Sequence, residues 1–388
     1  MKWEFVRLGD YCTKIGSGAT PKGGATAYID SGTSLIRSQN VYNLNFEYDG
    51  LVYITDEASK KLDGVTIFEN DILLNITGDS VARSCIVPVD VLPARVNQHV
   101  SIIRTKEKYL MPEFLSYYLV SPYMQAYMLN LAVGKGASRN ALTKDMIASF
   151  PIPLPTLKEQ EKIADFLLPY DNLIENNQKQ IKLLEEAAQR LYKEWFVDLR
   201  FPGYEKVPIV DGVPEGWNKS LLKEISEFKR GKTITKDSVI NGSIPVVAGG
   251  LEPAYYHNKA NTTAPVITVS GSGANAGFTR LYYNDVWASD CSFVDSNNTE
   301  YIYFVYCFLK NNKDRIDNLQ KGSAQPHVYA KDINALSFNL PNTEILNMFS
   351  EIIEPYFALI GKLQKQIRAA EQARDRLLPK LMSGELEV

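Results

Sequence analysis

The residue types that most often carry catalytic or metal chemistry are few and scattered in this chain. Its three histidines lie far apart, and its four cysteines, Cys12, Cys85, Cys291 and Cys307, include no Cys-x-x-Cys pair. This pattern favours neither a zinc site nor a disulfide framework and is typical of the reducing cytoplasm. We therefore expect no metal, no cofactor of the chain's own and a cytoplasmic location. No apolar run approaches the length of a membrane span, and the N-terminus does not resemble a signal peptide.

Two glycine-rich stretches, 16–18 and 271–277, resemble phosphate-binding loops at first sight. Neither has the Gly-x-Gly-x-x-Gly spacing between a strand and a helix, so we interpret both as turns. The chain also lacks a Walker phosphate loop and the Asn/Asp-Pro-Pro-Tyr/Phe motif of amino-methyltransferases. The sequence therefore indicates a binding protein, although an enzyme with unrecognised chemistry remains an alternative.

Polar and basic side chains in predicted loops are the remaining candidates for function. Arg, Lys, Asn, Gln and Ser can read base edges in the major groove of DNA, and basic side chains contact phosphates. Gly134 and Gly136 favour a loop that presents backbone donors to phosphate, so Lys135 and Arg139 are the strongest candidates. For each residue the alternative is a solvated turn position. The candidate DNA-binding residues are Arg37, Gln39, Asn40, Ser80, Arg83, Lys135, Ser138, Arg139 and Asn140 in the first half, and Asn275, Arg280, Lys321, Ser323, Gln325 and His327 in the second. His99 and Cys291, which occupy similar places, are expected to be core or structural residues.

A repeated segment must position these loops. A shift of 186 positions places 154–192 over 340–378 without a gap, with fourteen identical residues. A match at fixed offset indicates a tandem duplication. Looser similarities relate 1–153 to 214–339, for example the spacing of Trp3 to Leu8 and of Trp217 to Leu222, and the likeness of 71–78 to 265–271.

Both copies of the repeated segment carry apolar residues three and four positions apart. Such a pattern over about five heptads predicts two long helices that pair as a coiled coil. Asn177 and Arg374 are polar breaks in it. The alternative is two separate amphipathic helices, each packed on its own domain. The predicted seam consists of Ile163, Leu167, Tyr170, Ile174, Ile181, Leu184 and Leu191 in the first copy, and Phe349, Ile353, Tyr356, Ile360, Leu363, Ile367 and Leu377 in the second.

The ends and interruptions of these helices are also predictable. Thr156 and Glu159 form a capping box, so the first helix should begin just after Leu154-Pro155. Pro169 and Pro355 occupy equivalent positions and should kink or restart the helices. A run of about forty residues would extend roughly 60 Å.

The expected fold is therefore α+β, with two mixed α/β globular domains separated by two long helices paired antiparallel, and an internal pseudo-two-fold repeat. The predicted strands include 34–37, 71–75 and 99–104, followed by a helical pattern from 112 to about 131. The boundaries are 1–153 for the first domain, 154–200 for the first helical region, 201–213 for a linker, 214–339 for the second domain and 340–388 for the second helical region. Two similar domains at a fixed interval suit a two-part target such as a pair of DNA half-sites.

At this point the sequence resembles the specificity subunits of type I restriction-modification systems. The second long helix departs from the family's usual Leu-Pro-Pro-x-x-Glu-Gln-x-x-Ile by reading Leu340-Pro-Asn-Thr-Glu-Ile345. The motifs that carry the resemblance are Trp3-Glu-Phe-Val-Arg-Leu-Gly9, Gly216-Trp-Asn-Lys-Ser-Leu-Leu222, Leu154-Pro-Thr-Leu-Lys-Glu-Gln-Glu-Lys-Ile163, Leu191-Tyr-Lys-Glu-Trp-Phe-Val-Asp198 and Leu377-Leu-Pro-Lys-Leu-Met-Ser-Gly384.

The resemblance implies a non-catalytic subunit with two target-recognition domains that bind double-stranded DNA. Its partners would be two methylation subunits, which use S-adenosylmethionine and extrude the target adenine, and restriction subunits, which use ATP. Outward-facing Phe166, Trp195, Phe196 and Ile352 are the candidate contacts for these partners. The alternative is a coiled-coil scaffold, or a protein-interaction module that does not bind DNA.

The overall charge is unusual for a DNA-binding protein. The net charge is −3, whereas neutralising several phosphates requires a basic face. We expect that basic residues gather on one face of each domain, and that partner subunits supply further positive charge.

Overall fold

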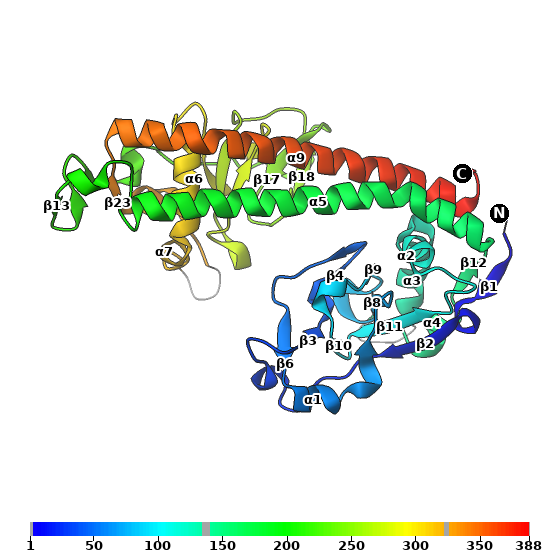
Figure 1. Ribbon diagram of the computed structural model, residues 1–388. Helices are drawn as coiled ribbons and strands as arrows, with labels where there is room; N and C mark the ends of the chain where they lie inside the picture. The colour runs from blue at the N-terminus through cyan, green and yellow to red at the C-terminus, as the bar shows by residue number, and fades with distance from the viewer. Residues whose placement is uncertain (1–2, 134–139, 322–325, 388) are drawn as a thin grey trace. The chain divides into compact units, whose positions relative to one another are not determined.

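The computed structural model describes residues 3–133, 140–321 and 326–387 (Figure 1). The chain forms two compact units. Unit 1 comprises Met1–Glu175 with Ile367–Val388, and unit 2 comprises Asn176–Gln366. The division falls inside two long helices, α5 (Leu157–Phe196) and α9 (Thr343–Ser383), so each unit contains one globular domain and a part of both helices. None of the helices within the described ranges is long and apolar enough to span a membrane.

Two four-stranded sheets form most of the domain in unit 1. In the first sheet, of order β2-β11-β8-β9, all neighbours are antiparallel, and in the second, of order β6-β3-β10-β7, β3 and β10 are parallel. The short hairpin β4-β5 and the pair β1-β12 complete the strands. The strands are β1 (Phe5–Arg7), β2 (Cys12–Ser17), β3 (Thr33–Ile36), β4 (Val41–Tyr42), β5 (Asn45–Phe46), β6 (Val52–Ile54), β7 (Thr66–Ile67), β8 (Ile72–Asn75), β9 (Ser84–Ile86), β10 (Ala94–Val96), β11 (Val100–Thr105) and β12 (Pro151–Pro153).

The predicted strands at 34–37, 71–75 and 99–104 are confirmed, within a residue or two, as β3, β8 and β11. The helical pattern predicted from 112 to about 131 is confirmed, and it forms two helices, α2 (Pro112–Val120) and α3 (Pro122–Ala132). Proline disfavours a helical conformation in the residue before it, so Ser121 is extended and caps α3 by accepting from the Met124 amide. Two further short helices are α1 (Asp56–Lys60) and α4 (Lys144–Ala148).

Unit 2 repeats this plan with fewer strands. Its larger sheet has the order β16-β22-β19-β20, and its smaller sheet, β18-β17-β21, again contains one parallel pair, β17 with β21. The remaining pairs are β13-β14 and β15-β23. The strands are β13 (Ile209–Val210), β14 (Val213–Pro214), β15 (Asn218–Leu221), β16 (Lys229–Arg230), β17 (Ile244–Val247), β18 (Tyr255–His257), β19 (Val266–Ser270), β20 (Thr279–Tyr282), β21 (Trp287–Ala288), β22 (Cys291–Asp295) and β23 (Ser337–Leu340), and the helices are α6 (Ile302–Asn311), α7 (Lys313–Asp317) and α8 (Ala330–Asn334).

The internal repeat extends to individual backbone hydrogen bonds. After β1, the Leu8 amide donates to the carbonyl of Phe150 at 3.0 Å, and after β15 the Leu222 amide donates to the carbonyl of Leu336 at 2.8 Å. The pairing of β1 with β12 therefore corresponds to that of β15 with β23, as the spacing of the two tryptophans predicts.

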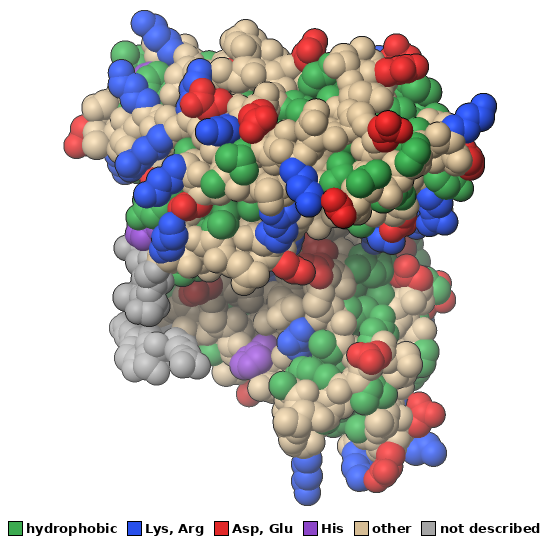
Figure 2. Space-filling model, turned by 90° about the vertical axis from the view of Figure 1, so that its left-hand side faces the viewer, with side chains coloured by type: hydrophobic (Ala, Val, Ile, Leu, Met, Phe, Trp, Pro, Cys, Tyr) green, Lys and Arg blue, Asp and Glu red, His purple; other side chains and the backbone are tan. Residues whose placement is uncertain are grey.

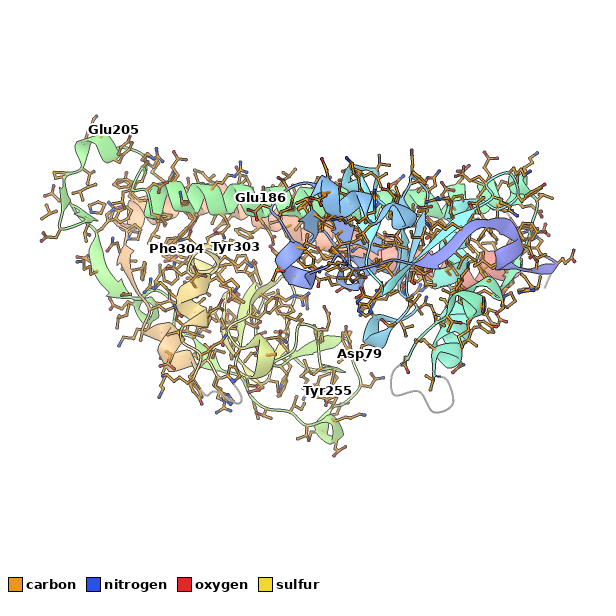
Figure 3. All side chains as sticks on the ribbon, turned by 90° about the horizontal axis from the view of Figure 1, so that it is seen from below. Asp79, Glu186, Glu205, Tyr255, Tyr303 and Phe304 are labelled. Atoms are coloured by element: carbon orange, nitrogen blue, oxygen red, sulfur yellow. The ribbon has the colours of Figure 1, made fainter. Side chains whose placement is uncertain are left out.

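The helices α5 and α9 pair antiparallel, and their seam continues into the core of each unit. In unit 1, Ile163 and Leu167 share a buried cluster with Leu378 and Leu381. In unit 2, the ring centroids of Trp195 and Phe349 lie 5.8 Å apart. Figure 3 shows Tyr303 and Phe304 on α6. The ring centroid of Phe304 lies 4.9 Å from that of Phe196 and 6.1 Å from that of Phe349. Of the predicted seam positions, the buried ones are Ile163, Leu167, Ile174, Phe349, Ile353, Ile360 and Leu363, and the half-buried ones are Tyr170, Ile181, Leu184, Leu191, Tyr356, Ile367 and Leu377.

The capping box at the start of α5 is confirmed, since the Glu159 amide donates to Thr156 Oγ1 at 3.4 Å and the Thr156 amide donates to Glu159 Oε2 at 3.0 Å. Of the two outcomes predicted at the prolines, the restart is wrong, because α5 continues through Pro169 and α9 through Pro355. The kink stays a prediction. Each proline removes one backbone donor, but both lie on the exposed side, where water can hydrate the unpaired carbonyl.

The two polar breaks in the seam have polar partners. In unit 2, buried Asn177 donates from Nδ2 to Gln366 Oε1 at 3.1 Å. In unit 1, Arg374 donates from Nη1 to Asp171 Oδ1 at 2.6 Å, and the Tyr117 hydroxyl of α2 donates to Asp171 Oδ2 at 2.5 Å. Burial and the adjacent Asp171 carboxylate raise the pKa of the Tyr117 hydroxyl, which therefore remains a donor. Burial opposes the charge on Arg374, but its bonds to Asp171 and Asp375 outweigh this effect and raise its pKa.

We expect the Asp171→Ala substitution to destabilise unit 1 by about 3 kcal/mol, because it leaves the Arg374 guanidinium buried without its main partner. The side chains of Arg374 and Asp171 are only 14% and 21% exposed, so water replaces little of the lost interaction. Native-state hydrogen exchange of amides in β8 and β11 would measure the change.

The exposed pair of Glu186 and Arg190 on α5 provides the control. These side chains are 43% and 83% exposed and lie 3.6 Å apart, so Glu186→Ala should change stability by less than about 0.5 kcal/mol. Equal effects of the two substitutions would contradict the role assigned to Asp171.

Candidate nucleic-acid interface

Three loops of unit 1 come together where β8 ends. Asn75, the last residue of β8, is completely buried and donates from Nδ2 to the carbonyl of Ser38 at 2.8 Å. Its backbone amide donates to the carbonyl of Arg83 at 2.8 Å, and its carbonyl accepts from the amide of Ala82 at 2.9 Å. One buried amide residue thus fixes the 37–40 loop beside the turn at 77–83.

The third loop returns to the same turn after α3. The amide of Gly78 donates to the carbonyl of Asn140 at 3.2 Å, and the amide of Leu142 donates to the carbonyl of Ile76 at 2.9 Å. Gly78 has a φ of +74°, a conformation that strongly favours glycine. Asp79 follows at the exposed outer part of this turn (Figure 3).

Polar side chains form a chain of contacts beneath the turn. Thr77 Oγ1 lies 2.7 Å from His99 Nδ1, and Gln98 Nε2 lies 3.1 Å from His99 Nε2. The Thr20 hydroxyl donates to Gln98 Oε1. Both ring nitrogens of His99 therefore contact polar partners in a partly exposed cluster, so of the two expected roles, core or structural, the structural one describes His99.

Unit 2 builds the same arrangement from different side chains. Ser270 takes the place of Asn75, because its hydroxyl donates to the carbonyl of Gly249 at 3.1 Å and its carbonyl accepts from the amide of Gly277 at 2.9 Å. The amide of Gly273, with a φ of +78°, donates to the carbonyl of Pro326 at 3.1 Å. The counterpart of Gly78 is therefore Gly273, two residues beyond the position suggested by the likeness of 71–78 to 265–271.

The hydroxyl beneath this second turn is bound by a carboxylate. Ser272 Oγ donates to Asp290 Oδ2 at 2.5 Å, so Asp290 occupies the place that His99 holds in unit 1. Cys291, which the sequence paired with His99, is 2% exposed as expected of a core residue, and burial raises the pKa of its thiol to about 12. The two units therefore differ in the residue that binds the hydroxyl of the turn: a histidine in unit 1 and an aspartate in unit 2.

Beside each of these turns, the end of another strand packs closely against a neighbouring backbone segment. A Cβ atom on Gly18, just after β2, would overlap the carbonyl oxygen of Val96, and one on Gly231, just after β16, would overlap that of Ser289. The 16–18 stretch, predicted to be a turn, thus includes the last residues of β2, and its glycine permits close chain crossing.

The predicted residues of unit 1 fall into several environments. Asn40 needs correction: it is completely buried, and its side chain binds the backbone of Arg37 and Glu47, so it is not available to a base. Arg37 donates from Nη2 to the carbonyl of Gly50 at 2.5 Å, and Gln39 approaches the same oxygen at 3.4 Å.

The other described candidates of unit 1 lie in or beside the turn at 77–83. Ser80 is half-buried, Asn140 is exposed, and the Arg83 guanidinium lies over the exposed Tyr42 ring, 4.5 Å from its centroid. The remaining candidates Lys135, Ser138 and Arg139 lie outside the described residues.

In unit 2, Asn275 ends the turn that follows Gly273, and the backbones of Lys321 and His327 exchange two hydrogen bonds of 2.9 Å. The Lys321 ammonium donates to Asp332 Oδ1 at 2.8 Å. Arg280 donates from Nη1 to the carbonyl of Leu251 at 2.6 Å, so the 248–251 loop and the turn are joined. Ser323 and Gln325 lie outside the described residues.

Sequence reasoning missed several residues of these sites, namely Thr20, Tyr42, Thr77, Gln98, Ser272, Asp290 and the 248–251 loop. A usable signal was present, because a hydroxyl residue followed by glycine occurs just beyond β8 as Thr77-Gly78 and just beyond β19 as Ser272-Gly273. The carboxylates, histidines and cysteines of the described residues form no group of three suited to a metal ion.

Charge is not segregated on the molecular surface shown in Figure 2, where basic and acidic side chains are interspersed. Near the turns, Arg83 lies over the Tyr42 ring, Arg280 donates to the carbonyl of Leu251, and Lys321 donates to Asp332.

The long helices expose equivalent apolar residues. Phe166 and Leu173 in unit 1 are 41% and 42% exposed, and their counterparts 186 positions later, Ile352 and Leu359 in unit 2, are 38% and 41% exposed. Trp195 and Phe196 were wrongly expected to face outward. Trp195 is 6% exposed, and Phe196 packs against Phe304 and Phe349 in the core of unit 2.

Comparison with known proteins agrees with this repeated architecture. The family model described as the type I restriction modification DNA specificity domain matches residues 1–186 and 214–370. The chain is 27% identical to the type I restriction enzyme MjaIX specificity subunit of Methanocaldococcus jannaschii, over all of this chain and 94% of that protein. It is 30% identical to the HindI specificity subunit of Haemophilus influenzae over 50% of this chain and 41% of that protein.

A solved structure shows the same fold. The S subunit of the type I restriction-modification system from M. genitalium matches with a TM-score of 0.60 and 16% identity, covering 98% of this chain and 96% of that one. The family match covers both repeats of the chain, including each domain and most of each long helix. The chain therefore belongs to the type I restriction-modification DNA specificity family.

Proposed function

We propose that this chain is the DNA-recognition subunit of a type I restriction-modification complex, and that each unit reads one half of a bipartite, asymmetric target. One observation carries the proposal: the same three loops meet at the end of β8 and of β19, but they present different side chains. Equal scaffolds with unequal surface chemistry suit two different half-sites on one duplex.

The two turns differ most in the group bound to their hydroxyl. A carboxylate such as Asp290 only accepts hydrogen bonds and favours the exposed amino group of cytosine, whereas an imidazole such as that of His99 can present a donor or an acceptor. The loops differ as well, because Arg37, Ser38 and Gln39 correspond to Ala248, Gly249 and Gly250. We assign base reading to these two turns and loops, and phosphate contacts to Arg83 and to the basic residues Lys135 and Arg139.

In this proposal the chain itself performs no chemistry and carries no cofactor. Methylation subunits would supply S-adenosylmethionine and extrude the target adenine, and restriction subunits would supply the nuclease, all in the cytoplasm with the DNA. Interspersed surface charge fits such a division, because the partners would neutralise part of the phosphate charge.

We expect Asp290→Asn to relax recognition of the half-site read by unit 2 and to leave the other half-site unchanged. A single base contact is worth about 1–3 kcal/mol of discrimination, so methylation at formerly rejected sites should become readily detectable. Single-molecule sequencing of methylated adenines, in cells that carry the chain with its methylation partner, reports both half-sites.

The matched control is Asp314→Asn, which removes an exposed carboxylate of unit 2 on α7, outside the turn. This variant should keep the original target. An unchanged target in Asp290→Asn, with normal methylation, would remove Asp290 from the recognition surface.

We further propose that α5 and α9 set the spacing between the half-sites. Both helices run without a break for 40 and 41 residues, and they pair in each unit. A helix with an intact seam is stiff enough to fix a distance.

Insertion of one heptad into both helices, at facing positions, should lengthen the spacer in the target. Seven residues add about 10.5 Å, or roughly three base-pair steps, and preserve the seam. Mapping of methylated sites would show the new spacer, with insertion of a heptad into α5 alone as a control that disrupts pairing. An unchanged spacer in the double insertion would show that the helices do not measure the distance.

The exposed apolar pairs provide two equivalent docking positions for partners. Phe166 with Leu173, and Ile352 with Leu359, are related by the repeat, so we propose that each pair recruits one methylation subunit. Native mass spectrometry of the reconstituted complex should therefore find two methylation subunits per chain. Phe166→Asp should reduce this number to one, because a charge at an apolar contact is costly. A wild-type complex with one methylation subunit would refute the count.

A further inference from the structure

A buried polar cluster joins α2, α5 and α9 in unit 1. Asp171 of α5 accepts from Arg374 of α9 at 2.6 Å and from the Tyr117 hydroxyl of α2 at 2.5 Å. The side chains of Arg374 and Asp171 are 14% and 21% exposed, and Tyr117 is 4% exposed. Removal of one partner from such a pair leaves an unpaired buried charge, which is strongly unfavourable.

The repeat places an apolar cluster at the equivalent position in unit 2. A shift of 186 positions takes Asp171 to Phe357 and takes Arg374 back to Ala188, and these residues are 1% and 0% exposed in one core cluster. The buried positions of α2 match those of α6 at an offset of 190, which places Cys307, 0% exposed, where unit 1 has Tyr117. The trio of tyrosine, aspartate and arginine in unit 1 is therefore cysteine, phenylalanine and alanine in unit 2.

The repeat also creates a problem of partner choice. Since α5 and α9 carry the same heptad pattern, α5 of a second copy presents a seam similar to that of the chain's own α9. In a pair of two α5 helices with the same register, Asp171 would face Ala188 of the other copy in place of Arg374. In a pair of two α9 helices, Arg374 would face Phe357.

We propose that the Asp171–Arg374 pair selects the pairing of α5 with α9 of the same chain and rejects like-with-like pairing between two copies. Each like-with-like pair would bury a charge without its partner, and would do so twice by symmetry. The correct pair neutralises both charges at once, and the apolar trio of unit 2 imposes no charge requirement of its own.

Side-chain volume supplies a second difference between the ends. Trp195 packs against Phe349 in unit 2, whereas the equivalent positions in unit 1 are Leu381 and Ile163. A test must therefore change the charges and leave these residues as they are.

The test uses the full chain, cut after folding. A protease site replaces the exposed turn at Asp211 and Gly212, between β13 and β14, so that cleavage yields an N-terminal fragment with α5 and a C-terminal fragment with α9. Equal amounts of isotope-labelled and unlabelled cut protein are mixed in urea at a concentration where fragments exchange, and the urea is then removed. Native mass spectrometry counts mixed and like-with-like dimers, and the isotopes verify exchange.

For the wild type we expect almost all dimers to contain one fragment of each kind. The variant Tyr117→Cys, Asp171→Phe, Arg374→Ala gives unit 1 the trio of unit 2, and its share of like-with-like dimers should rise at least about tenfold, since one removed charge penalty exceeds 1.4 kcal/mol. The charge-exchanged variant Asp171→Arg, Arg374→Asp keeps a neutral pair and should remain selective.

Either of two results would overturn the proposal. Wild-type fragments that pair at random would show that the charges do not select a partner. Equal shares of like-with-like dimers in the wild type and in the three-residue variant would assign the selection to side-chain volume. The wild-type measurement needs no substitution, so random pairing of its fragments would overturn the proposal even if a variant folded poorly.

Discussion

The burial of apolar residues between α5 and α9 in each unit is the constraint on which the rest of the structure depends. Each domain completes its core with residues from both helices: Ile163 and Leu381 in unit 1, and Trp195 and Phe349 in unit 2. The core of each domain therefore includes apolar residues of both long helices. The loops at β8 and β19 are thus supported by rigid elements, which is what precise recognition requires.

Sequence patterns predicted this framework well, because its signals are periodic and repeated. The heptads, the capping box at Thr156 and the offset of 186 each depend on residue type and spacing alone. Predictions based on single prolines were less secure. Pro169 leaves α5 intact because its missing hydrogen bond faces water, whereas Pro122 separates α2 from α3, where Ser121 can cap the next helix. The outcome depends on which face of the helix is buried, and tertiary packing decides this.

The candidate sites were harder to predict because the decisive bonds join distant parts of the chain. Asn40 is a residue type that can contact DNA bases, but its side-chain amide donates to backbone carbonyls up to nine residues away. His99 acquires its partner Thr77 only when β8 and β11 align. Composition alone does not distinguish a side chain that holds a loop from one that the loop presents.

The two units show which features the duplicated chain retained and which diverged. Backbone bonds at the turns persist, such as those of Gly78 with Asn140 and Gly273 with Pro326, while the side chains around them differ. Divergence at the surface permits two different half-sites to be read. In the seam, unit 1 has a charge pair where unit 2 has an apolar trio. This difference makes α5 and α9 of one chain prefer each other over like helices of a second copy. A perfectly repeated chain would have neither property, because equal turns would read equal sequences and equal seams would not distinguish α5 from α9.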